Sequence, residues 1–131
     1  MEVIKKIFMK SDKKKILVLE DEKPLARAME LKLIHEGFDV VTATSGEDIL
    51  STLKNCDYSL IVSDLLMSKV DGFQVLKILK ENNIKIPVII LTTLNQPEDE
   101  QKVRDLGAVE VFVKSETPIA DVIARIKEMV G

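Results

Sequence analysis

The chain has 131 residues, the length of one domain, and its 46% hydrophobic and 31% charged residues are typical of a soluble globular protein, not a disordered one. The net charge of −3 gives no general attraction to nucleic acid, so we expect no direct nucleic-acid binding. No apolar run reaches the roughly 20 residues that span a bilayer, and the single cysteine excludes an internal disulfide, so we expect a cytoplasmic protein without membrane contact.

The first 14 residues are expected to form a basic leader ahead of one folded domain at residues 15–131. Six lysines against two acidic residues give residues 1–15 a net charge of +4. Apolar residues recur at helical spacing within the leader, so a short helix is one option for it: Val3, Ile4, Ile7 and Phe8.

From residue 15 onwards, short apolar runs alternate with helical patterns. The apolar runs predict five strands, at residues 15–20, 39–43, 59–63, 88–91 and 109–113. Five helix starts follow the strands, at Pro24, residues 45–48, Asp71, Pro97 and the pair Thr117 and Pro118. Gly37 and Gly107 are placed to end the first and fourth of these helices.

Near-continuous apolar strands separated by helices predict an α/β protein whose parallel sheet is covered on both faces. With right-handed crossovers this gives a three-layer αβα sandwich. The pattern itself leaves the strand order open. A flavodoxin-like order of 2-1-3-4-5 would place the first and third strands side by side, and would bring Asp21 and Asp64 together.

Charged and polar residues follow four of the predicted strands at their carboxyl ends. Glu20 and Asp21 lie at the end of the first strand, and Asp64 follows the third, Thr92 the fourth and Lys114 the fifth. Each has an ordinary explanation alone, such as a solvent-facing lysine, but their occurrence at successive strand ends favours one shared site. Two carboxylates about 4 Å apart repel by roughly 4 kcal/mol at an effective dielectric near 20, which a bound cation removes. The carboxylates therefore predict a Mg²⁺ site.

A carboxylate beside a bound cation can also do chemistry. Asp64 can attack phosphorus as a nucleophile, because carboxylates form acyl phosphates in covalent catalysis. Such a transfer needs alignment and charge neutralisation more than acid–base help. Lys114 supplies a positive charge for a phosphoryl oxygen or for Asp64 itself.

Five motifs in this order resemble the receiver domain of two-component response regulators. They are residues 16–22, Asp64 with Met67 and the pair Asp71 and Gly72, residues 87–92, the pair Gly107 and Ala108, and the pair Val113 and Lys114. The resemblance covers about residues 14–130. It implies a CheY-like, flavodoxin-like (βα)5 fold with the parallel sheet order 2-1-3-4-5.

The resemblance also implies a role for each site residue. Asp64 would be the phosphoacceptor, and Asp21, Asp64 and the backbone carbonyl of Leu66 would hold Mg²⁺. Glu20 would contribute to that metal site through water. Thr92 and Lys114 would bind the phosphoryl group and couple it to a conformational change.

The implied partners are proteins of a phosphorelay. A sensor histidine kinase or a histidine phosphotransfer protein would donate the phosphoryl group, and a downstream protein would be the target. The face formed by the fourth helix, fifth strand and fifth helix would change its affinity for that target, and phosphorylation could drive homodimerisation. The chain would be a signalling switch and not an enzyme, catalysing only its own phosphorylation and dephosphorylation.

The chain departs from the usual receiver pattern at five positions: Glu20 (usually Asp), Ser68 and Ser115 (usually Pro), Thr93 (usually a small residue) and Val111 (usually aromatic). The neighbouring Phe112 does not restore the aromatic, because alternation along a strand points it to the other face. These departures predict that the acceptor chemistry is kept while the output machinery is atypical.

Two other functions are compatible with parts of the pattern. A receiver-like interaction module that works without phosphorylation fits the missing aromatic and prolines. An aspartyl-phosphate phosphatase of the haloacid-dehalogenase type would need a second Asp two residues after Asp64, where this chain has Leu66. Uptake of phosphate separates the signalling switch from the interaction module.

Overall fold

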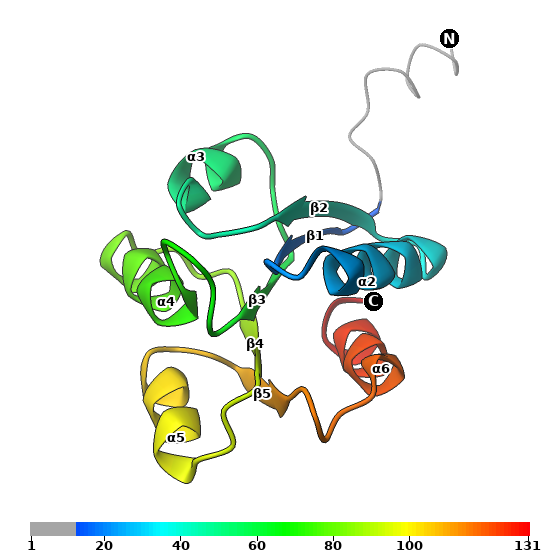
Figure 1. The fold of residues 1–131 in the computed structure, drawn as a ribbon. Helices are drawn as coiled ribbons and strands as arrows, with labels where there is room; N and C mark the ends of the chain where they lie inside the picture. The colour runs from blue at the N-terminus through cyan, green and yellow to red at the C-terminus, as the bar shows by residue number, and fades with distance from the viewer. Residues whose placement is uncertain (1–12) are drawn as a thin grey trace, which may run out of the picture.

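The computed structural model describes residues 13–131, so the helix considered for the leader lies outside the described residues. Within that range five strands and five helices alternate along the chain (Figure 1). The strands are β1 (Lys15–Leu19), β2 (Asp39–Ala43), β3 (Leu60–Asp64), β4 (Val88–Thr92) and β5 (Glu110–Val113). The helices are α2 (Lys23–His35), α3 (Ile49–Lys54), α4 (Gly72–Glu81), α5 (Pro97–Asp105) and α6 (Ile119–Val130).

The five strands form one parallel sheet in the order β2-β1-β3-β4-β5. The predicted flavodoxin-like fold and its strand order are therefore confirmed. β1 and β3 are direct neighbours, with Leu19 opposite Ser63. The residues that follow these two strands consequently emerge next to each other at one edge of the sheet.

The sheet separates two layers of helices (Figure 1). α3, α4 and α5 cover one face, and α2 and α6 cover the other. Side chains alternate between the faces along the inner strands. On β1, for example, Leu17 packs into the cluster under α3, α4 and α5, whereas Ile16 and Val18 pack into the cluster under α2 and α6. Burial on both faces explains why these strands are mostly apolar.

The same alternation decides the orientation of two residues on β5. Val111 belongs to the cluster under α3, α4 and α5, whereas Phe112 packs against the cluster on the opposite face. The expectation that Phe112 points away from the Val111 side is confirmed. The aromatic side chain therefore does not lie on the face where receivers usually carry one.

Several helix ends match the sequence signals. Pro24 lies in the first turn of α2, and Gly37 follows that helix with a φ of +97°, a conformation that glycine adopts without strain. Gly107 follows α5 with a φ of +110°. At α4, the Asp71 carboxylate accepts a hydrogen bond from the Gln74 backbone N–H, and the Gln74 side chain accepts one from the Asp71 N–H, which completes a capping box.

Two predicted helix starts lie earlier in the chain than the observed ones. Asp48 is the N-cap residue of α3, which begins only at Ile49, and no acidic residue lies in its first turn. The Gly46 N–H donates instead to the Val70 carbonyl at 3.1 Å, and the Ser45 hydroxyl accepts from the Glu47 N–H. Residues 45–48 are therefore bonded to the loop that contains Val70, and they form a turn and not the first turn of a helix.

At α6, Thr117 does not cap the helix. Pro118 is the N-cap residue, and its carbonyl accepts the first helical hydrogen bonds, from Asp121 and Val122. Its extended ψ of 148° places the helix start one residue later than predicted. Across residues 13–131, no helix is both long enough and apolar enough to cross a bilayer.

Candidate functional site

Four strands bring the predicted site residues to one edge of the sheet. Asp64 is the last residue of β3 and Thr92 the last of β4. Glu20 continues beyond β1, where its N–H donates to the Ala43 carbonyl at 2.9 Å. Lys114 follows β5, and its N–H donates to the Thr92 carbonyl at 2.7 Å. Backbone hydrogen bonds therefore fix the position of the backbone from which each of these side chains extends.

Lys114 lies between two buried carboxylates. Its Nζ donates to Glu20 Oε1 and to Asp64 Oδ2, both at 2.9 Å. Glu20 is 1% exposed and Asp64 is 5% exposed, while the Lys114 side chain is 16% exposed. Each buried charge has a partner of opposite sign, as burial of ions requires. One ammonium nevertheless serves two carboxylates.

Burial and these contacts together shift the pKa values of Asp64 and Lys114. Burial raises the pKa of the Asp64 carboxyl to about 6; the hydrogen bond from Lys114 opposes this rise, and the negative charge of Glu20 adds to it. Burial by itself lowers the pKa of Lys114, but the hydrogen bonds to Glu20 and Asp64 outweigh it and leave that pKa above its ordinary value. Lys114 therefore stays charged at neutral pH.

Asp21 completes an acidic cluster at this edge. One carboxylate oxygen from each of Glu20, Asp21 and Asp64 lies within 4.8 Å of the other two. Asp21 is exposed and the other two are buried. Three carboxylates against the one ammonium of Lys114 leave a net charge of −2. Hard carboxylate oxygens around an excess of negative charge fit a divalent cation such as Mg²⁺.

Thr92 contributes a buried hydroxyl whose orientation is set locally. It is 3% exposed, and its Oγ1 accepts a hydrogen bond from the Leu94 N–H at 2.9 Å. The hydroxyl proton is left to be donated elsewhere. Leu66, by contrast, has an exposed side chain, and its carbonyl as a metal ligand stays a prediction.

Comparison with known proteins decides which family this arrangement belongs to. A family model described as the response regulator receiver domain matches residues 16–127. The chain belongs to this family. It is a CheY-like receiver, which is a signalling module of two-component systems and not a catalytic enzyme. A two-component receiver implies a histidine kinase partner, and the acidic pocket is consistent with a phosphoryl-accepting response regulator.

Similar proteins include two curated regulators and a solved receiver. The chain is 38% identical over 117 residues to the probable transcriptional regulator ycf27 of Porphyridium aerugineum, covering 89% of the chain and 48% of that protein. It is 34% identical over 114 residues to the alkaline phosphatase synthesis transcriptional regulatory protein PhoP of Bacillus subtilis (strain 168), covering 87% and 47%. The receiver domain of Francisella response regulator 1452 superposes with a TM-score of 0.82 at 32% identity, covering 88% and 95%. The chain spans about half the length of the curated relatives it matches.

Sequence reasoning missed two contacts of this receiver. It related Lys114 to Asp64 and to a phosphoryl group, but not to Glu20. It also gave Gly72 no role beyond its place after the Asp71 cap. A Cβ on Gly72 would lie 2.7 Å from the carbonyl oxygen of Asp64, so the first turn of α4 packs directly on the backbone of the candidate phosphoacceptor. The only sequence signal for this close contact was the glycine itself, because it carries no Cβ.

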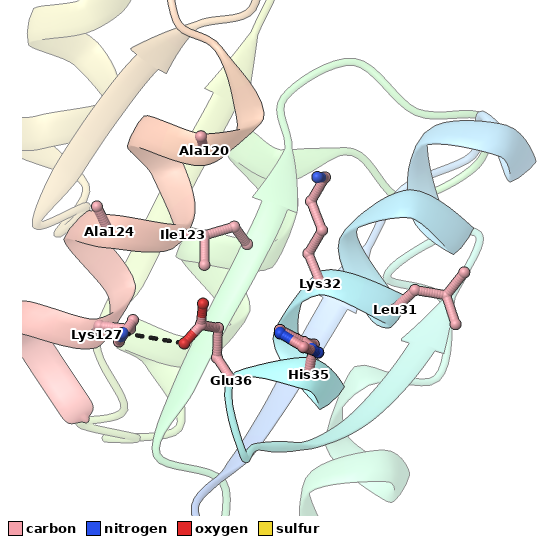
Figure 2. A pocket seen from close by; sticks show the side chains of 8 residues that line it. All are labelled: Leu31, Lys32, His35, Glu36, Ala120, Ile123, Ala124 and Lys127. Carbon is pink, nitrogen blue, oxygen red and sulfur yellow. Dashed lines mark ion pairs between the residues drawn. The ribbon is translucent and has the colours of Figure 1, made fainter.

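A groove on the α2 and α6 face of the receiver is separate from the acidic site (Figure 2). It is lined by Leu31, Lys32, His35, Glu36, Ala120, Ile123, Ala124 and Lys127. An ion pair of 3.0 Å between Lys127 and Glu36 links the two helices at one end of the groove. None of the residues of the acidic cluster lines it.

Proposed function

We propose that this receiver is a phosphoryl-accepting switch in which Asp64 takes the phosphoryl group from a sensor histidine kinase or a histidine phosphotransfer protein. The observation that carries the proposal is the environment of Asp64. Its buried carboxylate receives a hydrogen bond from Lys114 and lies within 4.8 Å of oxygens from Glu20 and Asp21. One edge of the sheet thus holds a nucleophile, a positive charge for the phosphoryl oxygens and carboxylate ligands for a metal.

The transfer is a displacement at phosphorus. A carboxylate oxygen of Asp64 attacks the phosphorus of a phosphohistidine in line with the P–N bond. A P–O bond forms while the P–N bond breaks, and its electron pair leaves on the imidazole nitrogen. A proton on the other ring nitrogen makes neutral imidazole the leaving group. With a pKa of about 6, Asp64 is deprotonated and nucleophilic at neutral pH.

Asp21 and Asp64, with the Leu66 carbonyl, would hold Mg²⁺, and Glu20 would contribute through water. When bound, the cation supplies charge neutralisation for the phosphoryl oxygens. On the protein side, Lys114 donates to a phosphoryl oxygen and the Thr92 hydroxyl donates to another. Leu94, whose N–H donates to Thr92, is displaced when the hydroxyl moves, so the loop after β4 follows the phosphorylation state.

The output of this switch is a change in protein–protein affinity. We propose that the surface of α5, β5 and α6 binds a downstream protein differently in the two states, with a homodimer as one form of that response. The two curated relatives named above are transcriptional regulators by name. For this receiver we propose a cytoplasmic location and no direct contact with nucleic acid or membrane.

The test is intact mass after incubation with acetyl phosphate, with and without Mg²⁺, beside the Asp64→Asn variant. We expect a Mg²⁺-dependent gain of one phosphoryl group that is absent from Asp64→Asn. A gain that persists in Asp64→Asn would refute Asp64 as the acceptor.

A second candidate is an interaction module that works without phosphorylation. It is favoured by the packing of Phe112 on the face opposite Val111, which leaves this receiver without the usual aromatic switch residue. Absence of any mass gain in a folded protein that binds Mg²⁺ would support this second function over the first.

A further inference from the structure

The loop that follows the candidate phosphoacceptor is fixed at both of its ends. This acceptor loop comprises residues 65–71 and connects β3 to α4. At its start the Leu65 N–H donates to the Leu91 carbonyl at 2.9 Å, and just after its end the Gly72 N–H donates to the Leu65 carbonyl at 2.9 Å. Leu66, whose carbonyl is the predicted Mg²⁺ ligand, lies between these bonds. Its position therefore depends on what holds the middle of the loop.

The middle of the acceptor loop has few anchors of its own. Within residues 13–131, the N–H groups of Leu66, Met67 and Ser68 donate no hydrogen bond to another backbone group, although the Met67 side chain packs against the apolar cluster. Ser68 stands where receivers usually have a proline, whose ring would fix the backbone. Lys69 has a φ of +64°, a left-handed conformation that is unfavourable for a residue with a Cβ. Such a conformation persists only where the surrounding structure imposes it.

The connection between β2 and α3 contacts the acceptor loop at two adjacent residues. We call this connection, residues 44–48, the β2–α3 turn. The Gly46 N–H donates to the Val70 carbonyl at 3.1 Å, and Glu47 Oε2 lies 3.3 Å from Lys69 Nζ. The turn is itself anchored, because the Gly46 carbonyl accepts a hydrogen bond from the first residue of α3 at 3.1 Å. The residue with the unfavourable backbone conformation is thus held from outside the loop.

Gly46 also allows the two segments to pack closely. A Cβ at this position would overlap Val75 Cγ2 of α4 and would lie 3.2 Å from Val70 Cγ1. Val75 is fully buried and β-branched, so its side chain has little freedom to turn away. The φ of Gly46 is not positive, so an alanine would suit its backbone and only the lack of space opposes it. A pocket of about 270 Å³ between the turn and the loop is also lined by Leu19, which places this contact beside the end of β1.

We propose that Gly46 is a positioning residue for the acceptor loop, assisted by the ion pair of Glu47 and Lys69, and that this contact holds the Leu66 carbonyl in place for Mg²⁺. The inference rests on the proposed function, because that function assigns the carbonyl to the metal. The contact with the turn compensates for the missing proline at Ser68. A wider gap between turn and loop should therefore weaken Mg²⁺ binding, although the turn itself contributes no ligand.

The experiment compares Gly46→Ala, Val75→Ala and the double variant. Gly46→Ala inserts a methyl group against Val75, and Val75→Ala removes the methyl group that it would meet. Val75→Ala alone is the control for a loss of core packing that leaves the contact between turn and loop intact. Mg²⁺ affinity is measured by isothermal titration calorimetry without a phosphodonor. Hydrogen exchange of residues 65–71 is measured by mass spectrometry in EDTA, beside urea unfolding of each variant.

For Gly46→Ala we expect Mg²⁺ affinity to fall about tenfold, as for the loss of other residues that orient a metal ligand, and exchange of the acceptor loop to become faster. Val75→Ala should lower the urea midpoint, because buried methyl groups are lost, yet leave Mg²⁺ affinity within about twofold. The double variant should bind Mg²⁺ within about threefold of the unmodified protein, since the added methyl group then has space.

Three results would overturn the proposal. The first is a Gly46→Ala variant with unchanged Mg²⁺ affinity and unchanged exchange of the acceptor loop. The second is a Val75→Ala variant whose affinity falls as far as that of Gly46→Ala, because the effect would then follow stability and not position. The third is a double variant that binds Mg²⁺ no better than Gly46→Ala.

The ion pair is tested separately with substitutions at exposed residues, which do not threaten folding. Glu47→Lys should speed exchange of the acceptor loop in EDTA, and adding Lys69→Glu should reverse this change by restoring opposite charges. We expect a change of about two- to threefold, because the pair is exposed. Asp48→Lys alters the charge equally at an exposed neighbour whose side chain makes no cap hydrogen bond, and it should leave the exchange unchanged. Equal effects of Glu47→Lys and Asp48→Lys would remove the ion pair from the proposal.

These measurements separate the inference from the proposed function. Neither the titrations nor the exchange needs a phosphodonor, and the exchange needs no metal. If acetyl phosphate leaves the unmodified receiver without a phosphoryl group, the proposed function fails, while the role of Gly46 is still decided by the exchange of residues 65–71 in its variants.

Discussion

Replacing Asp64 by asparagine should stabilise this receiver above about pH 6, and this stabilisation should fade as the pH falls from 6 toward 3.8. The buried pair of Asp64 and Glu20 shares a single lysine, so one carboxylate lacks full compensation. Asparagine removes the excess charge, keeps the size of the side chain, and offers Lys114 a carbonyl oxygen as acceptor. Lys114 and Glu20 are then a balanced pair.

The magnitude follows from the pKa of Asp64. Burial first, with the charge of Glu20 adding to it, raises this pKa from an ordinary 3.8 to about 6. A raised carboxyl pKa means that the folded state binds the proton more tightly, so the charged form destabilises the fold above pH 6. A rise of about two pKa units corresponds to about 3 kcal/mol. The penalty disappears as the pH falls from 6 to below 3.8, where both states are protonated.

The assay is urea unfolding followed by far-ultraviolet circular dichroism between pH 4.5 and pH 8, in the presence of EDTA. Near pH 8 we expect Asp64→Asn to unfold with a free energy up to about 3 kcal/mol above that of the unmodified protein. The difference should stay nearly constant down to about pH 6 and shrink as the pH falls further toward 4.5. Exposed Asp21 provides the control, since Asp21→Asn should change stability by no more than about 0.5 kcal/mol at any pH.

Addition of Mg²⁺ extends the same test. At a concentration 100 times its dissociation constant, a ligand that binds only the folded state stabilises it by about 2.7 kcal/mol. The unmodified receiver should therefore regain most of the difference from Asp64→Asn. A gap between the two proteins that is equal at pH 5 and pH 8 would refute the reasoning, as would an Asp64→Asn protein that is the less stable one at pH 8.

Three further predictions concern other parts of the site. Gly72→Ala should destabilise the fold by about 1–3 kcal/mol in urea unfolding, because its Cβ would lie 2.7 Å from the Asp64 carbonyl oxygen; a neutral substitution would contradict this close packing. Lys114→Met should lower the free energy of unfolding by about 3–5 kcal/mol in urea at pH 7 with EDTA, because two buried carboxylates lose their cation. A loss below about 1 kcal/mol would show that these carboxylates are solvated. The phosphorylated receiver should lose its phosphoryl group slowly. Leu66 lies two residues beyond Asp64 and Leu94 two residues beyond Thr92, and neither offers a polar side chain to orient water. A half-life of seconds, measured by intact mass, would contradict this.

The positions of the strands and of the acidic cluster could be predicted from the sequence because one physical rule governs both. A parallel sheet buried on both faces has apolar strands, and its carboxyl ends share an edge. Glu20, Asp21 and Asp64 therefore had to lie at this edge, and they lie close together because β1 and β3 are neighbours. The strand order was not available from this rule and came from the resemblance to receivers.

Contacts between distant segments were harder to predict. α3 starts late because Gly46 bonds to Val70, a loop residue that no local pattern connects with it. The bond between Glu20 and Lys114 joins residues 94 apart, and it depends on the length of the glutamate side chain and on the register of β5. Local signals fix elements and their ends, whereas such contacts depend on the assembled sheet.

The two apolar clusters on opposite faces of the sheet bear on how this domain can be redesigned. Ile61 and Val62 are adjacent on β3 but belong to different clusters, so their side chains share few neighbours. Substitutions at residues that do not touch usually have additive effects, whereas those within one packed cluster depend on each other. A library that varies Val62 together with Leu33 of α2 therefore samples coupled choices, and one that varies Val62 with Ile61 samples independent ones. The natural unit for repacking is a face of the sheet and not a stretch of sequence.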